Sequence, residues 1–139
     1  MKLSTRNQLK GKVASITKGI VNSEVIIQLA GKSQIVSIIT NGAVENLGIQ
    51  EGAEVIALIK SSNVMLGIGI EKISARNILC GKVASITDGA VNTEIVVDLG
   101  DGCMVTSVIT KTSAHKLGLD EGAEVCAVIK ASSVIVAVE

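Results

Sequence analysis

The sequence contains no phenylalanine, tryptophan, tyrosine or proline among its 139 residues, although 47% of them are hydrophobic. The core must therefore be built from valine, isoleucine, leucine and alanine, and β-branched side chains favour strands. The missing aromatics argue against binding of single-stranded nucleic acid, because that function uses aromatic side chains on which bases stack. The composition predicts a protein made mainly of β-strands.

An excess of charge is also missing, because 13 Lys and Arg residues balance 13 Asp and Glu residues. A neutral chain has no basic field to attract nucleic acid or anionic lipid. No apolar stretch reaches the roughly 18 residues that a membrane span needs. The first residues, MKLSTRNQLKGK, lack the apolar centre of a signal peptide. We therefore expect a cytoplasmic protein without a nucleic-acid or membrane partner.

The main feature that is present is an internal repeat. The run that begins STRNQLKGKVASIT at Ser4 returns from Ser74 without a gap, and about half of the aligned positions are identical. This repeat predicts two domains, residues 1–69 and 70–139, with almost no linker. A domain of about 60 residues buries only about 60% of its unfolded surface, so docking between the units or oligomerisation is expected.

Each repeat contains five short apolar segments bounded by Gly, Asn or Ser, a pattern typical of strands. In the first repeat they are residues 9–17, 24–30, 33–40, 53–60 and 64–70. A short helix is predicted over 43–48 and again over 113–118, each closed by a glycine, Gly48 or Gly118. Five strands with a helix after the third predict an all-β fold of two tandem OB-like Greek-key barrels. An ordinary β-sandwich is the alternative.

No set of residues suggests catalysis, which needs a nucleophile beside a base, paired carboxylates or a metal cluster. The single histidine, His115, aligns with Glu45 on the predicted short helix, where a solvated surface position is expected. The carboxylates common to both copies are expected to serve turns or cross-strand contacts: Glu24, Glu94, Glu51, Glu121, Glu54 and Glu124. The sequence therefore predicts a protein that is not an enzyme.

The three cysteines all lie in the second repeat, an odd number without the spacing of metal ligands. Cys80, Cys103 and Cys126 align with Lys10, Ser33 and Ile56 of the first repeat. Because the first copy has no thiol at these positions, the cysteines are predicted to fill space rather than to bind a metal.

The polar residues common to both repeats are mainly hydrogen-bond donors. The oxyanion of a strong acid only accepts hydrogen bonds, so its site must consist of Arg, Lys, hydroxyl and backbone N–H groups. The shared donors are Ser4, Arg6, Asn7, Thr40, Lys60 and Ser62, with their counterparts Ser74, Arg76, Asn77, Thr110, Lys130 and Ser132. The alternative is that Ser and Thr end strands, Asn caps turns, and Arg and Lys confer solubility. Residue types alone favour this alternative.

The segments SARN, GKVASI, GAVN, VIT, LGLDEGAEV and VIKAS resemble the Mop domain of molbindins, molybdate-responsive regulators and transporter ATPase subunits. The resemblance covers nearly the whole chain, twice, and the layout is similar to that of a tandem molbindin. It implies reversible binding of molybdate, and of tungstate, for storage and homeostasis, with no catalytic cofactor. The alternatives are a regulatory or interaction module of the same fold and, less favoured, an OB-type nucleic-acid binder.

The resemblance also implies where the anion binds. Sites lie at contacts between domains of neighbouring subunits, and six domains form a ring, which for this chain means a homotrimer. Carried over by position, the oxyanion ligands are Ser4, Arg6, Thr40, Lys60, Ser61, Ser74, Arg76, Thr110, Ser113, Lys130 and Ala131. A further site on the threefold axis would use Gly19, Val21, Asn22, Gly89, Val91 and Asn92. Two departures are Thr5, where the family prefers alanine, and Ala43, which replaces the hydroxyl of Ser113.

Overall fold

The computed structural model describes all 139 residues, as ten strands, two α-helices and two short 3-10 helices. The first repeat contributes β1 (Asn7–Lys18), β2 (Asn22–Gln28), β3 (Gln34–Thr40), α1 (Asn41–Leu47), β4 (Glu54–Ile59), η1 (Ser61–Asn63) and β5 (Met65–Gly67). The second contributes β6 (Asn77–Asp88), β7 (Asn92–Asp98), β8 (Met104–Thr110), α2 (Lys111–Leu117), β9 (Glu124–Ile129), η2 (Ala131–Ser133) and β10 (Ile135–Ala137).

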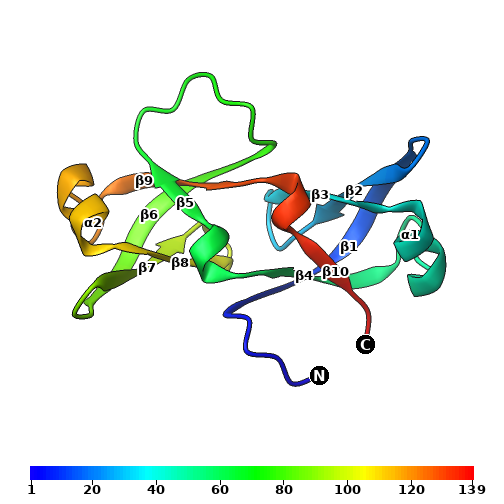
Figure 1. Cartoon of the computed structure of the whole chain (residues 1–139), viewed down its shortest axis with the longest axis horizontal. Coiled ribbons are helices and arrows are strands. Elements are labelled where there is room, and N and C mark those ends of the chain that lie inside the picture. Colours follow the sequence, from blue (N-terminus) through cyan, green and yellow to red (C-terminus); the bar gives the residue numbers. More distant parts are fainter.

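The strands form two antiparallel sheets of five strands, and the last strand of each repeat belongs to the sheet of the other repeat. One sheet has the order β10-β4-β1-β2-β3, and the other has the order β5-β9-β6-β7-β8. In the first sheet, β10 pairs with β4 through Ile135 and Leu58, and in the second, β5 pairs with β9 through Met65 and Val128. The two repeats are therefore interlocked side by side (Figure 1).

Each exchanged strand pairs with one strand of the other repeat's sheet and also contacts that sheet's edge strand. β10 also lies against β3, and β5 lies against β8. Each sheet is thereby rolled into the five-stranded arrangement of an OB-like barrel, with a short helix after the third strand. The predicted fold class is confirmed, including the helix positions, because Gly48 and Gly118 end α1 and α2 in the left-handed conformation with φ of 64° and 62°.

One long strand organises each sheet. The first half of β1 pairs with β4 and its second half pairs with β2, with a bulge between Val13 and Ser15. Gly11 lies before this bulge, and a Cβ atom there would collide with the carbonyl oxygen of Gln28. Gly81 approaches the carbonyl of Asp98 in the same way in β6. A glycine at this position lets the strand bend closely over its neighbour.

The core is made of Val, Ile, Leu and Ala, as the composition predicts, and much of it is shared. A cluster of 16 buried residues includes Val13 and Ile35 of the first repeat together with Ile129 and Val134 of the second. Cys103 is buried in this cluster, as a space-filling residue would be. No helix is both long enough and apolar enough to cross a membrane.

Candidate functional site

The N-terminal end of β1 and the C-terminal end of β4 bring two predicted ligands together. Asn7 pairs with Ile59 across these strands, so Arg6 and Lys60 lie opposite each other one step beyond the pairing. Ser4 precedes them and Ser61 begins η1. We call Ser4, Arg6, Lys60 and Ser61 the first donor cluster. The pairing of Asn77 with Ile129 forms the second donor cluster in the same way from Ser74, Arg76, Lys130 and Ala131.

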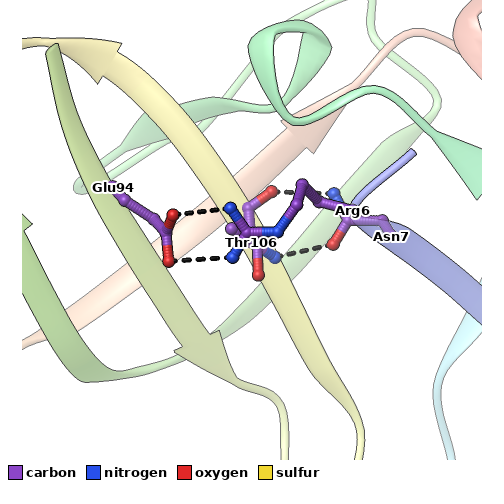
Figure 2. Close-up of polar contacts among 4 residues, drawn as sticks. All are labelled: Arg6, Asn7, Glu94 and Thr106. Atoms are coloured by element: carbon purple, nitrogen blue, oxygen red, sulfur yellow. Dashed lines mark hydrogen bonds and ion pairs between the residues drawn. The ribbon is translucent and has the colours of Figure 1, made fainter. Parts of the chain in front are cut away.

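Buried asparagines attach each donor cluster to the other repeat. The Asn7 side chain donates a hydrogen bond to the carbonyl of Thr106 (2.7 Å) and accepts one from its N–H (2.7 Å), as Figure 2 shows. Asn77 donates to the Val36 carbonyl (2.8 Å) and accepts from the Val36 N–H (2.7 Å). The Asn7 side chain thus hydrogen-bonds to the edge of β8, and the Asn77 side chain to the edge of β3, in the way that the backbone of a neighbouring strand would.

The two arginines also contact the opposite repeat, through ion pairs. Arg6 donates to both carboxylate oxygens of Glu94, at 2.7 and 3.0 Å (Figure 2), and Arg76 donates to Glu24 at 2.7 Å. The hydrogen bonds from the guanidinium groups lower the pKa of both Glu24 and Glu94. A guanidinium has five N–H donors, so Arg6 keeps donors beyond the two that Glu94 occupies. Sequence reasoning missed these partners, which lie far away along the chain.

The lysines of the donor clusters have no such partner. The two arginine pairs are the only ion pairs of the structure, and both Lys60 and Lys130 are exposed. Each lysine immediately precedes a 3-10 helix that has no side-chain cap, so the first N–H groups, beginning with that of Ser61 or Ala131, have no acceptor within the helix. Each donor cluster therefore combines an arginine whose charge is balanced by a glutamate, a lysine without a carboxylate partner, and neutral hydrogen-bond donors. This combination suits an anion.

The predicted threonine ligands cap the two α-helices. Thr40 and Thr110 end β3 and β8, where their side chains accept hydrogen bonds from the N–H of Ala43 and of Ser113 as helix caps. Thr110 also donates to the Ser113 hydroxyl at 2.8 Å, a contact that Ala43 cannot offer Thr40. Figure 1 shows α1 and α2 at opposite ends of the molecule.

The strand register fixes where each threonine lies relative to the asparagine contacts. Thr110 lies four residues beyond Thr106, the residue that Asn7 contacts, and this corresponds to roughly 13 Å along an extended strand. Thr40 stands in the same relation to Val36 and Asn77. The strand pairing therefore places each arginine opposite a lysine, whereas Thr40 and Thr110 end β3 and β8 as helix caps.

The residues predicted for a threefold-axis site form the tips of the β1–β2 and β6–β7 hairpins. The N–H of Gly19 donates to the Asn22 carbonyl, and the N–H of Gly89 donates to the Asn92 carbonyl, both at 2.8 Å. These tips stand out into solvent, and Ile20 at the first tip is fully exposed. They lie at the far end of β1 and β6 from the donor clusters.

The remaining titratable residues form no further site of this kind. No group of three or more His, Cys, Asp or Glu side chains is placed to hold a metal ion. His115 is exposed in the last turn of α2, as expected. Cys80 and Cys126, which were expected to fill space, instead form a disulfide between β6 and β9 that sequence reasoning did not predict.

Comparison with known proteins agrees with the repeat. The TOBE domain family matches residues 3–66 and again 73–136. The chain is 47% identical over 139 residues to the molybdenum-pterin-binding protein MopA of Rhodobacter capsulatus and 45% identical to the molybdenum transport protein ModE of Azotobacter vinelandii. These matches cover 99% of the chain, which spans about half (52%) of each of those relatives.

A solved structure extends the similarity to the whole chain. The cytoplasmic molybdate-binding protein ModG, crystallised with molybdate bound, superposes with a TM-score of 0.95 and 42% sequence identity, and all of both chains is covered. The predicted resemblance to tandem Mop proteins is thereby confirmed. Because the family model matches both repeats and the fold agrees with ModG over its full length, the chain belongs to the TOBE domain family as a tandem two-domain member.

Proposed function

We propose that this protein binds molybdate reversibly in the cytoplasm, for storage and homeostasis, without catalysing a reaction. The observation that carries the proposal is the pair of donor clusters, each with an arginine beside a lysine that has no carboxylate partner. The similarity to ModG, which is described as a cytoplasmic molybdate-binding protein, supports this ligand and this location. Tungstate is a tetrahedral dianion of the same kind, so we expect it to bind as well.

The chemistry of the cluster matches that of the ligand. Molybdate carries two negative charges and only accepts hydrogen bonds, so every contact must come from a donor. Lys60 or Lys130 supplies charge, Arg6 or Arg76 supplies its remaining N–H groups, and Ser4 or Ser74 supplies a hydroxyl. Such charge-assisted hydrogen bonds hold the anion without a covalent bond, which allows its release.

We further propose that a second copy of the chain completes each site. Thr40 and Thr110 use their side chains to cap α1 and α2, and no hydrogen bond joins them to a donor cluster within one chain. A neighbouring subunit that presents its threonine to a donor cluster would supply the missing hydroxyl. A homotrimer with six domains meets this need, and the hairpin tips around Asn22 and Asn92 would then meet near the threefold axis.

Equilibrium dialysis against molybdate in the presence of excess sulfate tests the ligand and the cluster together, with bound molybdenum measured by metal analysis. We expect at least one anion per chain. Removing Lys130 deletes a charge-assisted hydrogen bond of about 1.5–3 kcal/mol, so Lys130→Ala should weaken its site about 10- to 100-fold. Lys32→Ala, which removes an exposed lysine between β2 and β3, is the matched control. Retention of less than one anion per chain at saturation contradicts the storage function.

Light scattering coupled to gel filtration tests the assembly. The expected mass is three chains of 14.2 kDa. A monomer that binds molybdate at full capacity would contradict the shared site while leaving the ligand intact. Arg76→Ala combined with Lys130→Ala should lower capacity in an oligomer that still folds, and unchanged capacity would show that the donor cluster is not the site.

A further inference from the structure

Cys80 and Cys126 form an accessible pair on the second sheet. They lie directly opposite each other in β6 and β9, with their Cα atoms 3.9 Å apart, and the structure joins them in a disulfide. Cys80 is exposed and Cys126 is half-buried, and both line an open cavity of about 390 Å³ together with Lys82 and Glu124. Cys103 is buried in the core, and burial raises the pKa of its thiol. A small molecule in solution therefore reaches Cys80 and Cys126 but not Cys103.

The fold does not depend on this pair. Lys10 and Ile56 occupy the corresponding positions in the first sheet, are also directly opposite each other, and line a corresponding cavity with Lys12 and Glu54. The first sheet has the same strands and the same register without a covalent link. No residue of either donor cluster lines the two cavities. The second sheet therefore carries a reactive cysteine pair that the first sheet lacks and that its fold does not require.

We propose that Cys80 and Cys126 are a reversible modification site, which exchanges with low-molecular-weight disulfides of the glutathione type. The inference goes beyond anion binding and uses only the cytoplasmic location proposed above. In that compartment thiols are kept reduced, and disulfides are rare and mostly transient or redox-sensing. The dithiol is therefore the resting form, and the disulfide forms when the oxidised thiol pool rises.

The exchange has two steps, and its atoms and electrons balance. The Cys80 thiolate, which is the more exposed, attacks one sulfur of glutathione disulfide, so that a mixed disulfide forms and one glutathione thiolate leaves. The Cys126 thiolate then attacks the Cys80 sulfur and releases the second glutathione. The protein loses two electrons and two protons, and the small disulfide gains them. Lys82 and Glu124 lie directly opposite each other in β6 and β9 and line the same cavity as the two sulfurs.

Oxidation acts on one half of the protein only. The new bond ties β6 to β9, the strands that adjoin Arg76 and Lys130 of the second donor cluster. The corresponding strands β1 and β4 remain held by hydrogen bonds alone. The oxidised protein therefore has one sheet with a covalent link between its strands and one sheet without such a link.

Thiol counting in glutathione buffers tests the inference without molybdate, so its outcome is independent of the proposed ligand. The whole protein is equilibrated with mixtures of reduced glutathione and glutathione disulfide, denatured, alkylated with iodoacetamide and weighed by mass spectrometry. We expect three alkylated thiols when reduced glutathione is in large excess. One alkylated thiol, Cys103, is expected when the disulfide is in excess, with a higher urea midpoint of unfolding. Cys103→Ser should leave the change of two thiols intact, and Cys80→Ser should abolish it.

Three results would overturn the inference. A pair that stays oxidised in a large excess of reduced glutathione is a permanent structural disulfide. A pair that stays reduced in excess glutathione disulfide is not a modification site. Modification of Cys103 together with the pair in excess glutathione disulfide, seen as protein without an alkylated thiol, would show that accessibility does not select the pair. If Cys80→Ser does not fold, the titration of the unaltered protein and of Cys103→Ser still decides among these results.

Discussion

Replacing Asn77 with alanine tests whether the asparagine contacts hold the two repeats together. Asn77 is 2% exposed, and its side chain makes two hydrogen bonds, of 2.7 and 2.8 Å, to the backbone of Val36 on the outer edge of β3. Asn77→Ala removes both bonds, each worth about 1 kcal/mol net, and leaves a partly buried N–H and carbonyl without partners. The expected loss of unfolding free energy is about 2–4 kcal/mol, or roughly 8–16 °C in Tm for a chain of this size.

Urea denaturation followed by circular dichroism measures this loss, with calorimetry for the Tm. Asn46→Ala is the control, because Asn46 is exposed on α1 and its side chain makes no hydrogen bond. Asn77→Asp keeps an acceptor for the Val36 N–H but places a buried carboxylate against the Val36 carbonyl, so it should destabilise at least as much. A loss below about 0.5 kcal/mol for Asn77→Ala, equal to that of the control, would refute the reasoning.

Two further predictions concern the bend of the long strand and the inter-repeat ion pairs. Gly81→Ala forces a Cβ atom against the Asp98 carbonyl and should cost about 1–3 kcal/mol or more. Gly42→Ala on α1, where the nearest atom would be Thr40 Oγ1 at 4.0 Å, should stabilise by up to about 1 kcal/mol. Urea midpoints check both variants, and equal midpoints would contradict the predicted clash. Because Arg76 and Arg6 lower the pKa of Glu24 and Glu94 in the folded state, their contribution is present above the ordinary glutamate pKa and is lost as pH falls through the lowered values. The double variant Glu24→Gln with Glu94→Gln should therefore lose less unfolding free energy than the unaltered protein between about pH 6 and pH 3. Equal losses in the two proteins would show that the Arg–Glu ion pairs do not contribute to stability.

Several features of the fold follow from the sequence because they depend on local chemistry. The lack of aromatic residues and the abundance of Val and Ile indicated strands with a small-residue core, and the core confirms this. Gly48 marked the end of a helix because only glycine readily adopts the left-handed conformation there. The repeat itself was visible from sequence identity and fixed the number of similar units.

The partners of the site residues could not be predicted in the same way. The side chain of Arg6 binds Glu94, 88 residues away, and no local pattern records that distance. The same holds for Asn7 and Thr106, whose contact depends on how the repeats dock. Cys80 and Cys126 are neighbours only because β6 and β9 pair in one register, and a shift by one residue would move the two thiols apart.

The sequence by itself therefore determined the β class, the duplication and the supply of hydrogen-bond donors for an oxyanion, since composition and spacing record these directly. Only the tertiary structure decided that β5 and β10 are exchanged between the two sheets. The two repeats have the same apolar pattern, so the sequence offers each last strand two equivalent sheets to join. The pairing of β1 with β4 and of β6 with β9 sets each Arg opposite a Lys, and the Asn and Arg contacts attach each donor cluster to the other repeat. Long-range docking, which the pattern of one strand does not encode, thus decided how the predicted ligands are grouped.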